Sequence, residues 1–141
     1  MFYNAKEDTL KLDNVLMDYI TFGTGAKPLI MIQGLNTNGI KGAAVSLAYM
    51  YRIFAKEYKV YLFDRRTQVY DGITVREIAS DIAMAMDALQ ISKADVFGVS
   101  QGGMIAQYLA IDRPDLVNKL VLAVTISKNN DTVKKVLEKW M

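Results

Sequence analysis

Histidine and cysteine are both missing from the 141 residues. Without cysteine the chain can form no disulfide, thiolate zinc site or iron–sulfur cluster, and it has no cysteine nucleophile. Histidine is the usual base for a serine nucleophile, because its pKa lies near neutral pH. A reaction that relies on such a base must take it from outside these residues.

A large excess of one charge and long hydrophobic runs are missing as well. The formal net charge is +2, and no basic stripe interleaves with aromatic residues, so we expect no nucleic-acid partner. No run approaches the roughly 18 apolar residues that a membrane span needs, and the N-terminus has no apolar signal-peptide core. We therefore expect no membrane partner and, with cysteine absent, a cytoplasmic location.

The residues that are present are typical of a folded globular domain, since 52% are hydrophobic and 23% are charged. Short apolar runs alternate with segments of helical periodicity. Strands are predicted at residues 10–12, 15–22, 29–32, 60–63, 95–98 and 120–124, and helices at residues 43–56, 74–89, 101–111 and from about residue 130 to 140. Thr74 and Glu77 match a capping box at the start of the second helix. This alternation predicts a parallel sheet whose ligands bind beyond the carboxyl ends of its strands.

One motif with a chemical meaning lies at such a strand end. Residues 98–102 read Gly98-Val99-Ser100-Gln101-Gly102, a G-x-S-x-G sequence between a predicted strand and a predicted helix. In a nucleophile elbow the serine occupies a sharp, strained turn, and small neighbours let the strand and the helix pack closely around it. The helix N-terminus beneath the serine favours developing negative charge. The motif predicts Ser100 as a nucleophile; the alternative is a structural turn with a serine cap.

Together with this motif, the order of the other elements resembles the α/β-hydrolase superfamily over nearly the whole chain. The matching features are an opening antiparallel pair, a strand that runs into Gln33-Gly34, a strand that ends in Asp64-Arg65-Arg66, the elbow, and Arg113-Pro114-Asp115 before the strand at Leu120. The resemblance implies an α/β fold with a mostly parallel sheet flanked by helices, truncated after the strand from Leu120 to Val124. We expect residues 1–127 to form the N-terminal part of the core and residues 128–141 to begin the cap or lid region. A helix on a membrane surface is the alternative for this tail.

The resemblance also implies a site. Ser100 would be the nucleophile, and the backbone N–H groups of Leu35 and Gln101 would form the oxyanion hole, each worth roughly 2.7–4 kcal/mol in the transition state. The alternative for Leu35 is an apolar loop residue that packs under a cap. Asn36 and Thr37 are candidate substrate-binding residues, although a polar surface loop explains them equally well. No metal site and no cofactor are expected.

The chain departs from the family pattern at several points. Gln33-Gly34 stands where the family often has His-Gly, and the sequence after Asp64 lacks the usual glycines. We expect Asp64 and Arg66 to form an internal structural pair. The family order Ser…Asp/Glu…His places the triad acid and histidine beyond residue 141.

The resemblance thus implies a serine hydrolase that acts on a small carboxylic ester or lactone, inactive as this chain alone. A non-catalytic binding protein with the same fold, and an acyltransferase or haloperoxidase type of relative, are the alternatives. As partners we expect a missing C-terminal half or a second chain. An oligomer formed through the exposed sheet edge at residues 120–124 is a further possibility.

Overall fold

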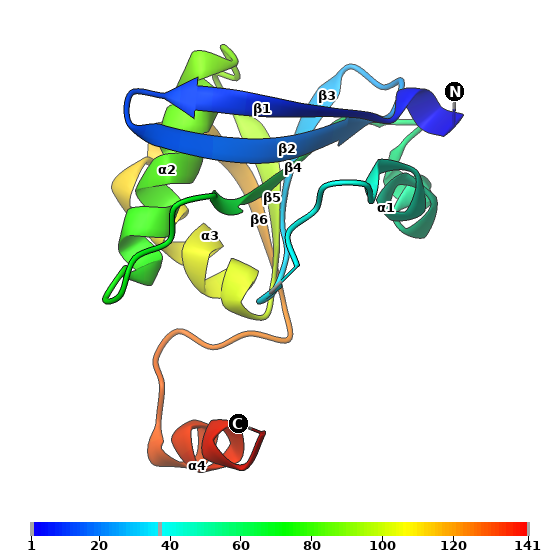
Figure 1. Ribbon diagram of the computed structural model, residues 1–141. Coiled ribbons are helices and arrows are strands. Elements are labelled where there is room, and N and C mark those ends of the chain that lie inside the picture. The colour runs from blue at the N-terminus through cyan, green and yellow to red at the C-terminus, as the bar shows by residue number, and fades with distance from the viewer. Residues whose placement is uncertain (1, 37, 141) are drawn as a thin grey trace.

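Six strands form a mixed sheet in the computed structural model, which describes residues 2–36 and 38–140 (Figure 1). The sheet order is β1-β2-β4-β3-β5-β6. The strands are β1 (Lys6–Leu12), β2 (Val15–Phe22), β3 (Lys27–Ile32), β4 (Tyr58–Arg66), β5 (Ala94–Val99) and β6 (Val117–Ala123). The pairs β1–β2 and β2–β4 are antiparallel, whereas β4, β3, β5 and β6 run parallel. The predicted mostly parallel sheet with an antiparallel opening pair is confirmed.

Helices cover both faces of this sheet. They are α1 (Ala44–Met50), α2 (Val75–Ala88), α3 (Gln101–Asp112) and α4 (Asp131–Trp140), with short 3-10 turns η1 (Phe2–Asn4), η2 (Arg52–Phe54) and η3 (Pro114–Leu116). Figure 1 shows α2 and α3 on one side of the sheet, α1 on the other, and α4 standing away from it. In the part of the chain described, no helix has the length and apolar character needed to cross a membrane.

The two inner strands β3 and β4 explain why apolar residues follow one another in the sequence. Ile30 and Phe63 are fully buried in the cluster under α2 and α3, while Met31 and Leu62 are fully buried in the cluster under α1. Because successive side chains point to opposite faces, a strand covered on both sides is apolar at every position. These strands fix the carboxyl-end rim of the sheet.

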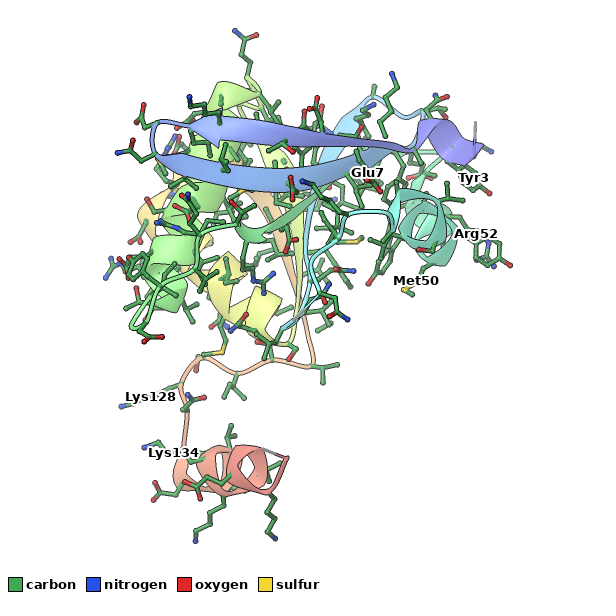
Figure 2. The ribbon with its side chains drawn as sticks, in the orientation of Figure 1. Tyr3, Glu7, Met50, Arg52, Lys128 and Lys134 are labelled. Carbon is green, nitrogen blue, oxygen red and sulfur yellow. The ribbon has the colours of Figure 1, made fainter. Side chains whose placement is uncertain are left out.

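The N-terminus of helix α1 is held by a carboxylate from strand β1. Its N-cap residue, Ala43, offers no side-chain oxygen, and the carboxylate of Glu7 accepts hydrogen bonds from the N–H groups of Gly42 and Ala44, both at 3.0 Å. A carboxylate at this end also favours the helix dipole. Figure 2 shows Glu7 on β1, close to the start of α1. The contact fixes the chain just after the loop that follows β3.

The predicted helix over residues 43–56 is too long. Helix α1 ends at Met50, Tyr51 has φ −102° and ψ 20°, and the 3-10 turn η2 follows. Tyr51 and Phe54 still pack against the buried cluster under α1. Residues three apart lie on one side of a 3-10 turn as well as of an α-helix, so their spacing did not distinguish the two.

Candidate functional site

Ser100 lies at a sharp turn between β5 and α3. Its backbone has φ 53° and ψ −122°, a conformation with positive φ that non-glycine residues seldom adopt. The Ser100 N–H donates to the carbonyl oxygen of Ala123 on β6 at 2.9 Å, and the Ser100 side chain is exposed. The turn therefore holds the hydroxyl at the rim of the sheet, in the geometry of a nucleophile elbow.

Two glycines beside Ser100 allow this turn because the space for a side chain is already filled. A Cβ atom on Gly98 would lie 2.6 Å from the carbonyl oxygen of Gly102. A Cβ atom on Gly102 would lie 2.0 Å from the carbonyl oxygen of Ile32 and 2.5 Å from that of Gln33. All three distances are shorter than real contacts, so α3 can approach β5 and β3 this closely only with glycine at 98 and 102.

The loop after β3 passes directly beside the serine. A Cβ atom on Gly34 would lie 3.2 Å from the Ser100 Cβ and 3.7 Å from its Oγ. Among the residues described, neither the Leu35 N–H nor the Gln101 N–H donates a hydrogen bond. Two unpaired backbone donors therefore lie in the residues next to Gly34 and Ser100.

Asn36, a candidate substrate-binding residue, uses its side chain within its own loop. Its Nδ2 donates to the carbonyl oxygen of Gly39 at 2.8 Å, and its Oδ1 accepts from the Asn38 N–H at 3.0 Å. Thr37, the other candidate, lies outside the described residues. Substrate binding by these two residues stays a prediction.

A cavity of about 640 Å³ opens in front of Ser100. Most of its lining is apolar and comes from the loop after β3, from α3 and from the segment after β6, and none of its lining residues is charged. The apolar side chains belong to Leu35, Val75, Met104, Val124, Ile126 and Val133. A ligand here would meet few polar groups besides those of the elbow itself.

Two side-chain hydrogen bonds hold the segment after β6 against Ser100 and α3. The Thr125 hydroxyl donates to the Ser100 carbonyl oxygen at 2.6 Å, and the Gln107 amide donates to the Ile126 carbonyl oxygen at 3.0 Å. Val124, the residue between β6 and Thr125, has φ 50° and is 90% exposed. A β-branched residue in this conformation is strained. Its neighbours fix it where its side chain lines the cavity.

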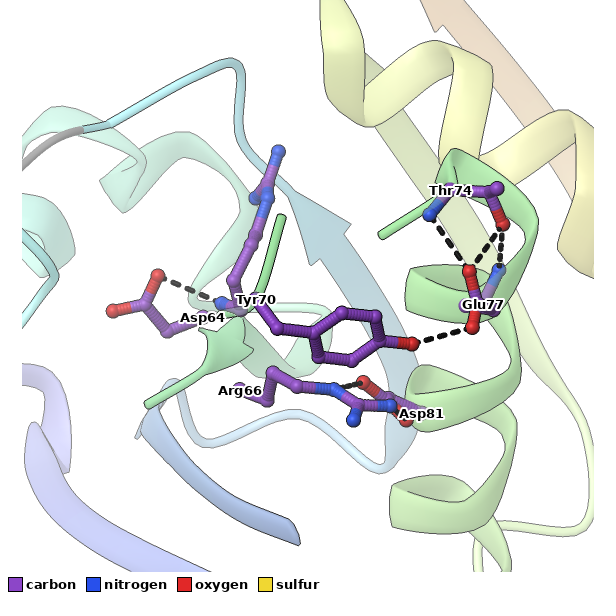
Figure 3. A network of polar contacts seen from close by, with 7 residues as sticks. Asp64, Arg66, Tyr70, Thr74, Glu77 and Asp81 are labelled. Carbon is purple, nitrogen blue, oxygen red and sulfur yellow. Dashed lines mark hydrogen bonds and ion pairs between the residues drawn. The ribbon is translucent and has the colours of Figure 1, made fainter. Parts of the chain in front are cut away.

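Asp64 and Arg66 do not form the internal pair that the sequence suggested. The Asp64 carboxylate accepts from the N–H groups of Ile40, at 3.0 Å, and of Arg65, at 2.8 Å. Arg66 instead makes two hydrogen bonds of 2.8 Å with the buried carboxylate of Asp81 on α2 (Figure 3). Alternation alone would place residues 64 and 66 on one face of β4, but the β2–β4 register shifts between the pairs Tyr19–Phe63 and Met17–Arg66. This irregularity lets Asp64 and Arg66 contact partners on different sides of the sheet.

The capping box predicted at α2 is confirmed and extends to Tyr70. The Thr74 side chain accepts from the Glu77 N–H, and the Glu77 carboxylate accepts from the Thr74 N–H at 2.8 Å. The Tyr70 hydroxyl donates to the same carboxylate (Figure 3). These bonds, with that from Tyr70 the largest contribution, lower the pKa of Glu77 to about 2. The network holds the loop after β4 against α2.

The described residues contain no partner for the Ser100 hydroxyl. No side chain hydrogen-bonds to its Oγ in the described ranges, and the sequence contains no histidine. In the same ranges, no group of three or more His, Cys, Asp or Glu side chains could hold a metal ion. Among the described residues, the turn at Ser100 and the neighbouring N–H groups are thus present without a hydrogen-bond partner for the hydroxyl.

A family model described as alpha/beta hydrolase fold matches residues 27–141. The chain belongs to this α/β-hydrolase family. It is 32% identical to 3-oxoadipate enol-lactonase 2 of Acinetobacter baylyi, over 86% of this chain and 46% of that protein. It is 25% identical to epoxide hydrolase 1 of Caenorhabditis elegans, over 93% of this chain and 33% of that protein.

Solved structures of α/β hydrolases have the same fold. The structure of Est816, described as an N-acyl homoserine lactone degrading enzyme, matches with a TM-score of 0.70 and 27% identity, over 84% of this chain and 45% of that one. The epoxide hydrolase CorEH matches with a TM-score of 0.77 and 20% identity, over 96% of this chain and 50% of that one. The chain thus spans half or less of the length of these relatives.

Within the α/β-hydrolase fold, the structure brings Ser100, Gln101 and Leu35 together, as the sequence suggested, around one cavity. Two sets of contacts near Ser100 were not predicted from the sequence. The first is the hydrogen bond from the Thr125 hydroxyl to the Ser100 carbonyl oxygen. The second is the donation from the Arg65 guanidinium to backbone carbonyl oxygens near Ser100. The position of Arg65 at the end of a predicted strand, on the ligand-binding rim, was the available signal.

Proposed function

We propose that this chain supplies the nucleophile and the oxyanion hole of a serine hydrolase that acts on a carboxylic ester or lactone. The Ser100 Oγ attacks the carbonyl carbon, and a histidine from outside these residues takes the hydroxyl proton. The N–H groups of Leu35 and Gln101 bind the resulting oxyanion. The alcohol leaves with the proton, and water then hydrolyses the acyl-enzyme to release the acid.

The backbone of Ser100 is the observation that carries this proposal. A serine at φ 53° is strained, and strain of this kind persists where the surrounding structure enforces it, often at active sites. A structural cap would not need the strain, because a serine can cap a helix from ordinary extended backbone. The exposed hydroxyl, the free N–H donors and the adjacent apolar cavity support the same role.

The ester or lactone class is supported by the relatives. The enol-lactonase relative is named for a lactone substrate, and the Est816 structure is described as that of a lactone-degrading enzyme. The uncharged lining of the cavity suits a substrate without a charge near its scissile carbonyl. Asn36 and Thr37 remain candidates for contacts to that substrate.

The triad histidine and acid would come from a further segment of the same polypeptide or from a second chain. The segment after β6, residues 128–141, would then begin the cap over the cavity, and Val133 of α4 already lines that cavity. The exposed β6 is a surface on which a further strand, a second chain or another copy could pair. A cytoplasmic location stays a prediction.

The test is labelling of the complete natural polypeptide that carries this sequence with a fluorophosphonate probe, followed by denaturing mass spectrometry. The Ser100 Oγ displaces fluoride from phosphorus, so we expect a single adduct at Ser100 and none in a Ser100→Ala variant. Ser127→Ala, which changes an exposed serine in the segment after β6, should label like the unmodified protein.

Other results would contradict the proposal. An adduct that persists in Ser100→Ala, or no adduct under conditions that label a known serine hydrolase, would leave Ser100 without a nucleophilic role. The same spectrum also registers any second polypeptide. If no histidine-bearing segment accompanies the chain, the proposed source of the base is wrong.

A further inference from the structure

Arg65, the residue after Asp64 on β4, contacts both sides of the proposed oxyanion hole. Its Nη2 atom donates to the carbonyl oxygen of Gln33 at 2.8 Å and lies 3.4 Å from that of Gly34. The same nitrogen donates to the Oε1 atom of Gln101 at 2.8 Å. One guanidinium nitrogen thus joins the loop after β3 to the first residue of α3.

This contact set differs from those of the arginines that serve the fold. Arg66, Arg76 and Arg113 each pair with a carboxylate at 2.8 Å or less. The guanidinium of Arg65 forms no ion pair within the described residues, and its buried Nε atom has no acceptor there. Burial lowers the pKa of Arg65, while the neighbouring Asp64 carboxylate opposes this shift. Holding a cation in such a place costs stability, so a purely structural role explains it poorly.

Because a peptide unit is planar, the contacts of Arg65 with carbonyl oxygens also orient a backbone N–H group. The carbonyl group of Gly34 and the N–H group of Leu35 belong to one planar trans peptide, in which they point in opposite directions. A guanidinium that attracts the Gly34 oxygen therefore turns the Leu35 N–H away from itself. The contact with the Gln33 oxygen fixes the preceding peptide plane in the same way.

The contact with Gln101 adds the second donor segment. Arginine only donates hydrogen bonds, so the Gln101 side chain must present its oxygen to Arg65. The backbone N–H of the same residue is the other proposed oxyanion donor. Arg65 thereby connects the peptide that carries the Leu35 N–H with the residue that carries the Gln101 N–H.

We propose that Arg65 is a positioning residue that orients the Leu35 N–H and holds it in register with the Gln101 N–H for the oxyanion. This role rests on the proposed hydrolase function. Arg65 does not touch the reacting atoms; it acts through the two backbone segments it joins. An error of about 1 Å in such a donor can lower the rate about 100-fold.

The experiment measures 4-nitrophenyl butyrate hydrolysis by the complete natural polypeptide carrying Arg65→Met, Arg65→Lys or Arg76→Met. For R65M we expect kcat to fall about 10- to 100-fold with KM within about threefold, because transition-state binding is lost. R65K, which can still donate to carbonyl oxygens, should recover part of the loss. Arg76→Met removes an exposed arginine paired with Asp112 and should leave kcat within about twofold.

Thermal unfolding of R65M distinguishes a positioning role of Arg65 from a role in folding. Because Arg65 is only partly buried and its contacts are hydrogen bonds to uncharged oxygens, R65M should stay fully folded at the assay temperature. A fall in kcat that follows a fall in folded protein would mean a structural role. A kcat within threefold of the unmodified protein would refute the positioning role.

Labelling of Ser100 by the fluorophosphonate probe distinguishes the two proposals. If the unmodified protein is labelled and R65M is labelled equally fast, the positioning role alone fails. If Ser100 of the unmodified protein is never labelled, the hydrolase function fails and the positioning role falls with it. A variant Gln101→Met, which keeps the backbone N–H but removes the side-chain acceptor, should slow labelling less than R65M.

Discussion

Strands β4 and β6 have similar apolar sequences and very different surroundings. Leu62 and Phe63 of β4 are fully buried between the two layers of helices. Val121 and Leu122 of β6 are 50% and 41% exposed at the end of the sheet. An apolar run therefore predicts a strand but not what covers it, which depends on the elements packed on either side.

The other edge of the sheet supports this distinction. Strand β1 carries Lys6, Glu7 and Asp8 as exposed residues, and charged side chains of this kind keep an edge strand from pairing with other chains. Strand β6 has no comparable protection at Leu120, Val121 and Leu122. The β1 edge is thus protected by charged side chains, whereas the β6 edge is open.

The largest effect should follow loss of the ion pair that fastens β4 to α2. Asp81 is 1% exposed and accepts two hydrogen bonds from Arg66, so Asp81→Asn should lower the free energy of unfolding by about 3 kcal/mol. Urea unfolding measures the change. The control Asp87→Asn breaks the largely exposed contact with Arg113 and should cost under about 1 kcal/mol. Equal losses in the two variants would show that β4 is no more tightly held than the surface.

A smaller loss is expected at the start of α2. Thr74→Ala removes the side chain that caps this helix and should lower the free energy of unfolding by about 1 kcal/mol. Ser80→Ala, on the exposed side of the same helix, should change it by less than about 0.5 kcal/mol. A capping residue that proved no more important than Ser80 would mean that packing alone fixes this end of α2.

The same network should make stability depend on acidity. The pKa of Glu77 lies at about 2 in the folded chain, below its ordinary value of 4.5. The carboxylate therefore stabilises the fold fully above about pH 4.5, and this contribution disappears as the pH falls toward 2. Unfolding measured across this window should be less pH-dependent in Glu77→Gln than in the unmodified chain. A slope unchanged by the substitution would assign the acid sensitivity to other carboxylates.

At the open edge, a substitution should change association more than stability. Val121→Lys places a charge on exposed β6 and should alter the free energy of unfolding by less than about 0.5 kcal/mol. It should shift the 141-residue chain toward monomer in sedimentation velocity, because a charged edge strand resists pairing. Val45→Lys, an exposed valine on α1, should leave the distribution unchanged. If the unmodified chain is already a monomer at high concentration, β6 is not a pairing surface.

The sequence predicted what depends on local pattern. The buried strands, the capping box at Thr74 and the turn at Ser100 follow from residues close together in the chain. The partner of Arg66 could not be read in this way, because Asp81 lies 15 residues further on, across a loop and a turn of α2. The contacts of Arg65 could not be predicted for a related reason: its backbone acceptors are carbonyl oxygens, which every residue carries whatever its type.

The spacing of the apolar residues did not reveal that α1 ends at Met50. Tyr51 and Phe54 keep contact with the buried cluster under α1 although the helix has ended, because a 3-10 turn preserves a separation of three residues. The chain must also return to β4 at Tyr58, which leaves little length for further helix. Periodicity identified the buried face correctly and gave the wrong backbone for its last turn.

The close approach at Gly102 has a consequence for any effort to alter this site. The distance between β3 and the start of α3 is set by main chain against main chain, with no side chain between them to shorten or lengthen. Side-chain substitutions therefore cannot change the distance between β3 and the start of α3 without moving the main chain. Val124 and Ile126, whose side chains line the cavity from the segment after β6, are different. A library at these two positions can reshape what the cavity accepts while the backbone around Ser100 keeps its geometry.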